Sequence, residues 1–477
     1  MKNRRDFLKI VGMGAAVASV PGIAFAQHQR EGTSSVNPYI SGHTSQVNET
    51  PIPVVSADLP DLPFRMVNGA KEFHLIAEPV KRELLPGRVL DLWGYNGTAP
   101  GPTIQVNQGD RVRIVVDNHL PEPTSMHWHG FEIPFAMDGA PGMSQPLIPP
   151  GGRFVYEFLL HQNGTFFYHS HLAMQEMMGM IGAFIMHPPK AFAPAVDKDF
   201  AIILQEYAVL PNNTVPNSMN MEFNWLTMNG KSGPATTPMI VRLGERVRIR
   251  LINLGMDHHP IHIHGHTFVI TGTEGGRQPQ TTWGPKNTVL VGVAEAYDVE
   301  FLANNPGDWM FHCHMPHHMM NQMSSVVGPM TRRPGGMPAG LSMNSGMGMP
   351  EGGALAEGNG PSLGRGMGVG STYDQRISNG PMAAQQSMPG MEMGTKKEAG
   401  PEIAPNANSV PGFPQDAFME SPMMAMDKAV AKPETYGLRP GWSAFLQGMM
   451  TLVRVLPPEL YDKIMALKAQ QVTHPTR

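Results

Sequence analysis

An internal repeat constrains the fold of this 477-residue chain more than any other feature of its sequence. Three stretches match in the same order: GDRVRIVVDN at 109–118 with GERVRIRLIN at 244–253, HWHG at 127–130 with HIHG at 262–265, and GTFFYHSH at 164–171 with GDWMFHCH at 307–314. The repeat predicts two copies of one domain, at residues 62–190 and 198–330.

Both copies are predicted to consist of β-strands. Their apolar runs are short and bounded by Gly, Pro, Asn and Asp, which is typical of strands separated by turns. Few helical patterns occur, so the sequence predicts an all-β fold of sandwiches or barrels. The expected strands are Ile104–Val106, Arg111–Val116, Phe154–Leu159, Ile181–Met186, Ala201–Gln205, Met239–Leu243, Arg246–Ile252, Thr267–Ile270, Val289–Val293 and Val299–Leu302.

The N-terminus has the pattern of an export signal. Residues 3–9 (NRRDFLK) contain a twin-arginine pattern, an apolar stretch runs from Ile10 to about Ala26, and AFA at 24–26 is a plausible cleavage site. An uncleaved membrane anchor is the alternative, but glycines and a proline interrupt the stretch, which is short for a spanning helix. We expect residues 1–26 to be removed and the folded protein to be periplasmic, without stable membrane insertion.

Three further segments flank the repeat. Residues 27–61 are polar and are expected to form a loose N-terminal arm. Residues 331–417 are rich in Gly, Met, Pro, Ser and Asn and cannot bury a core, so we expect them to be largely disordered. Residues 418–477 regain a pattern, with helices expected at Trp442–Leu456 and Pro458–Gln470, separated at Pro457-Pro458.

Charge and cysteine content exclude several classes of protein. The formal net charge is -4, and the sequence offers no basic patch for nucleic acid. The single cysteine, Cys313, excludes an intramolecular disulfide.

Four His-x-His pairs occupy matching places in the two copies. On a β-strand, residues i and i+2 point to the same face, so each pair presents two imidazoles side by side. Imidazole binds copper, zinc, iron and nickel. Histidines that only fill a core are the alternative, but four pairs at repeated positions favour metal binding. The pairs are His127/His129, His169/His171, His262/His264 and His312/His314.

Cys313 lies between two of these histidines, so its side chain points away from theirs. His318 follows it by five residues and Met323 by ten, and His259 stands upstream. Two histidines, a thiolate and a weak methionine are the ligands of a blue-copper electron-transfer site. Cys313 would then bind copper and connect it, through the chain, to the flanking histidines. An inert buried cysteine is the alternative.

These motifs resemble the four copper motifs of multicopper oxidases, in order and spacing, over residues 62–330. They are HWHG at 127–130, HSH at 169–171, HPIHIH at 259–264 and HCHMPHHMMNQM at 312–323. The resemblance implies two tandem cupredoxin-like Greek-key β-sandwich domains and four copper ions per functional site. It also implies an enzyme that couples one-electron oxidation of a substrate to the reduction of dioxygen to water.

The resemblance also assigns the ligands of each copper. A type 1 copper would receive electrons, and one type 2 and two type 3 ions would form a trinuclear cluster. The implied ligands are His259, Cys313, His318 and Met323 for type 1, His127 and His262 for type 2, His129, His169 and His314 for one type 3 ion, and His171, His264 and His312 for the other.

The chain differs from three-domain members of that family. Only a short linker separates the copies, and Ser170 stands where the second copy has Cys313. It therefore resembles the two-domain type with type 1 copper in the second domain, which implies a homotrimer with clusters between subunits. Some relatives have an acid where this chain has Met319, which leaves the proton donor open. Asp138 is our candidate, and an ordinary turn aspartate is the alternative.

The methionine clusters indicate which substrate supplies the electrons. Thioether sulfur favours Cu(I), and methionine clusters follow the His169 motif, surround Cys313 and recur beyond residue 331. We therefore expect Cu(I) oxidation in copper tolerance, with laccase-like oxidation of phenols or aromatic amines as the alternative. Core packing and a plain linker are the other roles open to the methionines. Copper storage or delivery is a less favoured function, because it needs no type 1 cysteine. A copper nitrite reductase is also less favoured, because those enzymes place the type 1 copper in their first domain.

Overall fold

The computed structural model describes residues 50–209, 213–218, 221, 223–319, 324–325, 417–418 and 426–473. The predicted signal peptide, the arm up to residue 49, Met323 and almost all of the Met-rich segment at 331–417 lie outside the described residues. Among the helices that are described, none is both long and apolar enough to cross a membrane.

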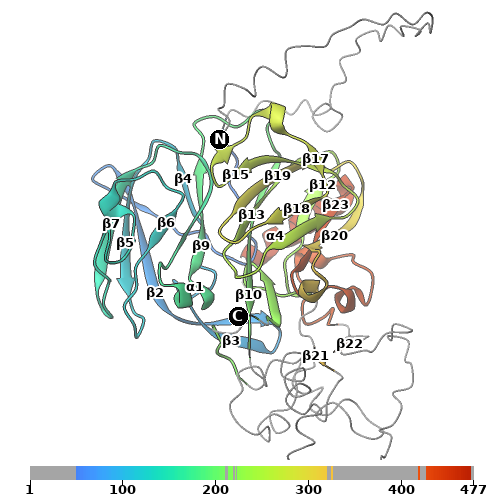
Figure 1. Ribbon diagram of the computed structural model, residues 1–477. Coiled ribbons are helices and arrows are strands. Elements are labelled where there is room, and N and C mark those ends of the chain that lie inside the picture. Colours follow the sequence, from blue (N-terminus) through green and yellow to red (C-terminus); the bar gives the residue numbers. More distant parts are fainter. Residues whose placement is uncertain are drawn as a thin grey trace, which may run out of the picture. The chain divides into compact units, whose positions relative to one another are not determined.

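The first copy of the repeat consists of two sheets that share one apolar core (Figure 1). In the five-stranded sheet β2 pairs with β1, β3 and β5, and β5 pairs with β7; the four-stranded sheet has the order β4-β9-β8-β6. The strands are β1 (Arg65–Val67), β2 (Ala70–Leu85), β3 (Arg88–Tyr95), β4 (Ile104–Asn107), β5 (Arg111–Asn118), β6 (His127–His129), β7 (Arg153–Leu159), β8 (Gly164–His169) and β9 (Ile181–His187).

Side-chain alternation explains how this core orients the first histidines. Val112, Ile114 and Val116 on β5 are fully buried, and burial of each such side chain contributes about 2 kcal/mol. On β6 the buried residue is Trp128, which packs in the same core. Because neighbouring residues on a strand face opposite sides, Trp128 directs His127 and His129 away from the core.

The second copy also consists of two sheets. The seven-stranded sheet has the order β11-β10-β13-β19-β15-β16, with β17 paired to β15, and the five-stranded sheet has the order β12-β23-β20-β14-β18. The strands are β10 (Lys198–Tyr207), β11 (Trp225–Met228), β12 (Met239–Arg242), β13 (Arg246–Asn253), β14 (His259–Ile263), β15 (Phe268–Thr273), β16 (Gly276–Arg277), β17 (Pro285–Lys286), β18 (Thr288–Val291), β19 (Ala296–Leu302), β20 (Gly307–Cys313) and β23 (Met450–Leu456).

The predicted all-β class is confirmed, and each of the ten predicted strands overlaps an observed one. The long pair β2 and β3 was not predicted. The short elements are α1 (Ala173–Met177), the 3₁₀ helices at Phe135–Met137, Gln280–Thr282, Pro316–Met319, Pro433–Thr435 and Trp442–Phe445, and the two-stranded pair β21 (Ser324–Ser325) and β22 (Ala417–Phe418).

The last strand of the second copy comes from far along the chain. β23 lies between β12 and β20, parallel to the first and antiparallel to the second (Figure 1). Our prediction of a helix over Trp442–Leu456 is therefore wrong at residues 450–456, which form this strand. The second domain also extends beyond its predicted end at residue 330. All of β23 is buried, as its apolar and β-branched residues favour. The helix predicted next is confirmed as α4 (Pro458–Thr473).

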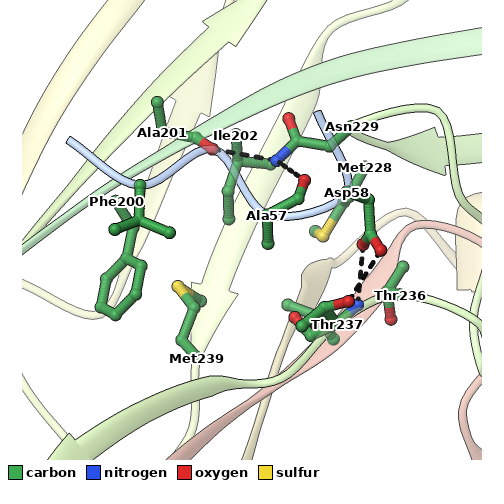
Figure 2. Close-up of a pocket in the computed structure, with 12 residues that line it drawn as sticks. Ala57, Asp58, Phe200, Ala201, Ile202, Met228, Asn229, Thr236, Thr237 and Met239 are labelled. Atoms are coloured by element: carbon green, nitrogen blue, oxygen red, sulfur yellow. Dashed lines mark hydrogen bonds between the residues drawn. The ribbon is translucent and has the colours of Figure 1, made fainter. Parts of the chain in front are cut away.

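Residues 50–61, expected to belong to a loose arm, pack against the body of the protein. Asp58 accepts hydrogen bonds from the backbone N–H and the hydroxyl of Thr237, at 3.0 and 2.7 Å (Figure 2). Its carboxylate also lies 3.0 Å from the Lys432 ammonium, which ties the arm to the C-terminal segment. No histidine or cysteine lines the small cavity at this junction.

A buried charge network lies where the two copies meet. On β13, Arg250 donates to Asp199 at 2.8 Å and to the Thr165 hydroxyl of β8 at 2.7 Å. The same hydroxyl donates to Asp298 at 2.5 Å. Apolar residues of β8, β9, β10 and β13 form a shared cluster around this network. The two copies are thereby held together by both apolar and charged contacts.

Candidate metal centres

The first set of four histidines gathers at one end of the sheet β4-β9-β8-β6. His127 on β6 pairs in register with His169 on β8. The His127 ring contacts the rings of His129, His169 and His171, at centroid distances of 5.8, 5.3 and 5.2 Å. His129 Nδ1 lies 3.4 Å from His169 Nε2, so ring nitrogens converge as metal ligands require.

The second set has the same arrangement in the other domain. His262 on β14 pairs in register with His312 on β20. The His262 ring contacts the rings of His264, His312 and His314, at 5.0, 5.7 and 5.5 Å. His264 Nε2 lies 3.1 Å from His312 Nε2. All eight predicted cluster histidines therefore fall into two matching groups.

Backbone carbonyls fix one ring nitrogen of corresponding histidines in the same way. The Nδ1–H of His127 donates to the Asp138 carbonyl, and that of His262 donates to the Asn287 carbonyl, each at 2.7 Å. Gly139 makes the first contact possible, because its φ is +90° and a Cβ there would lie 1.7 Å from the Met126 carbonyl oxygen. Each Nε2 is left to face the other histidines.

The next pair of equivalent histidines repeats this device. The Nδ1–H of His169 donates to the Ser170 carbonyl and that of His312 to the Cys313 carbonyl, each at 2.8 Å. A metal-binding histidine ordinarily donates its second nitrogen to a carbonyl or carboxylate, which sets the tautomer and ring orientation. The partners of these four histidines therefore fit a metal site in both domains.

Burial favours the neutral form of four of the eight histidines, and a histidine must be neutral to bind a metal. It lowers the pKa of His129 to about 4. Burial is also the main cause that lowers the pKa of His127, His264 and His312. Neutral imidazoles suit borderline ions such as copper or zinc.

A third group, His259, Cys313 and His318, forms a buried pocket behind the second set. The Cys313 sulfur lies 3.5 Å from His318 Nδ1 and 3.8 Å from His259 Nδ1, and the two nitrogens are 3.1 Å apart. These distances suit three donors around one ion, because metal–nitrogen and metal–sulfur bonds are about 2.0 and 2.3 Å. One thiol with two imidazoles is the donor set of blue copper.

The thiol itself needs a metal to ionise. Burial raises the pKa of Cys313 to about 12, so the metal-free protein carries a neutral S–H at pH 7. A coordinating ion removes the proton of a thiol. The chemistry of this pocket therefore fits a soft, thiolate-binding metal such as copper better than a structural role for the cysteine.

Two carboxylates that sequence reasoning missed lie at the outer nitrogens of this pocket. Glu206 Oε2 is 3.0 Å from His259 Nε2, and both side chains are fully buried. Asp257 Oδ2 is 3.3 Å from His318 Nε2, and the Asp257 side chain is 33% exposed. Glu206 also accepts hydrogen bonds from the backbone N–H groups of Met256 and Asp257. These carboxylates orient both imidazoles so that each Nδ1 faces the thiol.

The corresponding place in the first domain holds hydroxyl and amide groups. Thr124 and Ser170 both donate to the Gln175 side-chain oxygen, at 2.7 and 2.8 Å, and their hydroxyls are 3.3 Å apart. All three side chains are buried. The repeat therefore places three polar side chains in one domain where the other has two imidazoles and a thiol.

Comparison with known proteins identifies the family. Models described as multicopper oxidase match residues 78–191 and 208–330, the two copies of the repeat. The chain belongs to the multicopper oxidase family. Members of this family are copper-dependent oxidoreductases that act on dioxygen.

Relatives of this multicopper oxidase cover different shares of the chain. Copper resistance protein A of Escherichia coli is 41% identical over 112 residues, 24% of this chain and 18% of that protein. Laccase-2 of Botryotinia fuckeliana is 33% identical over 237 residues, 45% of this chain and 40% of that protein. The crystal structure of the blue copper oxidase from Nitrosomonas europaea is 33% identical, with 53% of this chain and 81% of that chain covered and a TM-score of 0.48. The chain spans less than half of either curated relative.

Not every predicted ligand of this multicopper oxidase is brought together. Three of the four expected type 1 ligands converge, whereas Met323 lies outside the described residues. Within the described part of the chain, no ring contact or hydrogen bond joins a histidine of the first set to one of the second. Asp138, the candidate proton donor, lies beside the first set, with Oδ1 3.6 Å from His127 Nδ1.

Proposed function

We propose that this multicopper oxidase oxidises Cu(I) at the second domain and passes the electrons to dioxygen. The observation that carries the proposal is the buried pocket of His259, Cys313 and His318, with a carboxylate at its exposed edge. Four one-electron oxidations of Cu(I) to Cu(II) supply the four electrons that, with four protons, reduce one dioxygen to two waters. Removal of Cu(I) in this way would serve copper tolerance.

The ligand assignment is part of the proposal. His259, Cys313 and His318 would hold the type 1 copper, and bound copper would supply one-electron transfer there and dioxygen reduction at the trinuclear cluster. The proposed cluster ligands are His127 and His262 for type 2, His129, His169 and His314 for one type 3 ion, and His171, His264 and His312 for the other.

The chain itself would connect the two kinds of centre. Cys313 faces the type 1 pocket, while its neighbours His312 and His314 face the second histidine set. Electrons leaving the thiol therefore need to cross only bonds of residues 312–314. Asp138 is the proposed proton donor for dioxygen reduction, because its carboxylate lies beside His127.

We propose a homotrimer because the two histidine sets do not meet within the described part of one chain. The type 3 assignments each combine histidines of both sets, yet within one chain the described rings of the two sets make no mutual contact. A head-to-tail ring lets the first set of one subunit meet the second set of its neighbour, and a rotation that closes gives a cyclic oligomer.

Two features favour Cu(I) over a neutral aromatic reductant. The first is the Asp257 carboxylate beside His318, because a partly exposed negative charge attracts a cation. The second is the Met-rich segment, because thioethers bind Cu(I). This segment begins at residue 331, shortly after the 3₁₀ helix Pro316–Met319, which contains His318. Both features would raise the local concentration of Cu(I) at the pocket.

Oxygen uptake by copper-loaded, full-length protein tests this proposal. Cu(I) and a methoxyphenol would be supplied in parallel at matched electron supply. We expect faster uptake with Cu(I), and Asp257→Asn should slow the Cu(I) reaction at least several-fold while it leaves the phenol reaction nearly unchanged. Faster uptake with the phenol would favour a laccase, and no uptake with either would favour copper storage.

An internal deletion tests the Met-rich segment without removing β23. β21 and β22 pair, so a short turn can join residue 325 to residue 417. We expect this deletion to slow Cu(I) oxidation more than phenol oxidation. The matched control keeps the full length and replaces Met343, Met347, Met349, Met388, Met391 and Met393 by leucine. Equal effects on both substrates would remove the segment from the mechanism.

Laccase-like oxidation is the second candidate, because the similarity to Laccase-2 extends over 45% of this chain. The same oxygen-uptake experiment decides between the two substrates. The proposed site of action is the periplasm, reached by twin-arginine export. Cell fractionation with Arg4→Lys/Arg5→Lys as the control tests that route, since the paired change should leave the protein in the cytoplasm.

A further inference from the structure

The final strands of the two domains match in sequence as well as in position. GMIGAFIMHPP at 179–189 corresponds to GMMTLVRVLPP at 448–458. β9 begins at Ile181, which pairs in register with His169, and β23 begins at Met450, which pairs in register with His312. The residues immediately before these strands, Met180 and Met449, therefore occupy equivalent places.

Backbone hydrogen bonds confirm this equivalence at the pocket itself. Ser170 N–H donates to the Met180 carbonyl at 3.2 Å, and Cys313 N–H donates to the Met449 carbonyl at 3.0 Å. In the reverse direction, Met180 N–H donates to the Gln175 carbonyl at 3.3 Å, and Met449 N–H donates to the His318 carbonyl at 2.9 Å. Met449 is bonded to two of the three donor residues.

Burial agrees with this placement. Met449 has no exposed surface and belongs to the same core cluster as Cys313. Met180 is equally buried in the first domain, where no thiol is present. Backbone hydrogen bonds to Cys313 and His318 place Met449 beside the pocket, and a thioether is a soft donor that a copper ion can use.

We propose that Met449, and not Met323, supplies the weak fourth ligand of the type 1 copper. The inference rests on the proposed function, because it presumes that copper fills the pocket. Met323 matches only by its spacing of ten residues from Cys313, the same spacing that separates Met180 from Ser170. In the first domain β9 follows Met180 at once, whereas in the second domain the corresponding strand follows Met449.

This assignment changes how the Met-rich segment is understood. It is an insertion within the copper-binding loop, between the histidine ligand and the fourth ligand, rather than a C-terminal tail. The described elements on either side of it are the 3₁₀ helix Pro316–Met319, which contains His318, and β23, which begins directly after Met449. The type 1 site is completed only when the chain returns after the insertion.

Redox titration of the blue absorption in copper-loaded variants tests the assignment. Leucine would replace the fourth donor by an apolar side chain, and a more hydrophobic site with only three donors favours the less charged Cu(I). Met449→Leu should therefore shift the type 1 potential upward. A harder amide oxygen favours Cu(II), so Met449→Gln should shift it downward. Met323→Leu should leave both the potential and the absorption maximum unchanged.

Met180→Leu serves as the packing control. It makes the same side-chain change at the equivalent buried position and should leave the type 1 potential unchanged. A potential that responds to Met323→Leu, or that fails to respond to both Met449 variants while the protein stays blue, would overturn the assignment. Wild-type protein that loads copper without blue absorption would instead refute the proposed function, so the two failures are distinguishable.

Discussion

In the first domain, Thr124, Ser170 and Gln175 form a closed set of buried hydrogen bonds. In the second domain, His259, Cys313 and His318 stand at the equivalent backbone positions with their nitrogen and sulfur atoms 3.1–3.8 Å apart. The repeat therefore preserves backbone positions but not the chemistry of the side chains that occupy them. In one copy, oxygen and amide groups hydrogen-bond to one another, and in the other, converging nitrogen and sulfur donors form a candidate metal pocket.

The loops that close these sites differ as sharply. In the first domain only a few residues separate α1 from β9, whereas in the second more than one hundred separate the 3₁₀ helix Pro316–Met319 from β23. Loop-closure entropy grows only slowly with length, so a long insertion costs little once the final strand is well bound. A fully buried β23 between two partner strands meets that condition.

The largest expected effect comes from removing the returning strand. A chain that ends at residue 335 lacks β23 and Met449, so β12 and β20 lose their shared partner and the core of the second domain is exposed. We expect no folded second domain and no blue copper. Circular dichroism and copper content measure this, with the internal deletion of 326–416 as control. A truncated chain that folds and turns blue would refute the role of β23.

Loss of the thiol should remove one function while the fold persists. Cys313→Ser should abolish the blue absorption and lower turnover at least a thousandfold, because oxygen donors do not replace thiolate for copper of this type. Absorption and oxygen uptake report the two effects. Ser170→Ala in the first domain is the matched control and should keep both. Blue colour in Cys313→Ser would show that the pocket is misassigned.

The next largest difference between the copies is the burial of their charged side chains. Arg248 on β13 is buried beside Glu300, whereas the equivalent Arg113 on β5 is half-buried. Burial alone would raise the pKa of Glu300, but Arg248, Arg277 and Arg246 lower it to about 2. The folded pKa is therefore below the unfolded value of about 4.3, so this stabilisation is complete above pH 4.3 and is lost as pH falls toward 2.

Glu300→Gln removes that charge and leaves the arginines buried without it. We expect a loss of about 3 kcal/mol in the free energy of unfolding at pH 7. We also expect a weaker dependence of stability on pH between about 4.3 and 2. Urea unfolding at several pH values measures both effects. Glu157→Gln, at a partly exposed ion pair of the first domain, is the control and should change stability by less than about 1 kcal/mol.

The smallest effect is expected in the first-domain hydrogen-bond set. Gln175→Ala leaves the Thr124 and Ser170 hydroxyls without their common acceptor, which should cost about 2 kcal/mol. The blue absorption should not change, because the proposed type 1 donors lie in the other domain. Thermal unfolding and the absorption spectrum test this. A spectral change would mean that the first domain contributes to the type 1 site.

Features that depend on local sequence pattern could be predicted from the sequence. Features that depend on pairing between distant segments could not. Alternation and turn residues located ten strands. The repeat located four His-x-His pairs and the converging residues His259, Cys313 and His318. Glu206 and Asp257 were missed because their contacts with His259 and His318 arise from folding, not from spacing. β23 was taken for a helix because a long insertion hid its place in the repeat, although GMMTLVRVLPP after residue 447 matched GMIGAFIMHPP in the first copy.

The most direct test of the account is a count of type 1 copper in copper-loaded, full-length protein, by electron paramagnetic resonance and blue absorption against total copper and chain concentration. The account predicts four copper ions per chain, of which one is type 1. Two type 1 ions per chain would mean that Thr124, Ser170 and Gln175 do not exclude copper from the first domain. A complete lack of type 1 copper in the loaded protein would contradict the central claim that the second-domain pocket is a type 1 copper site.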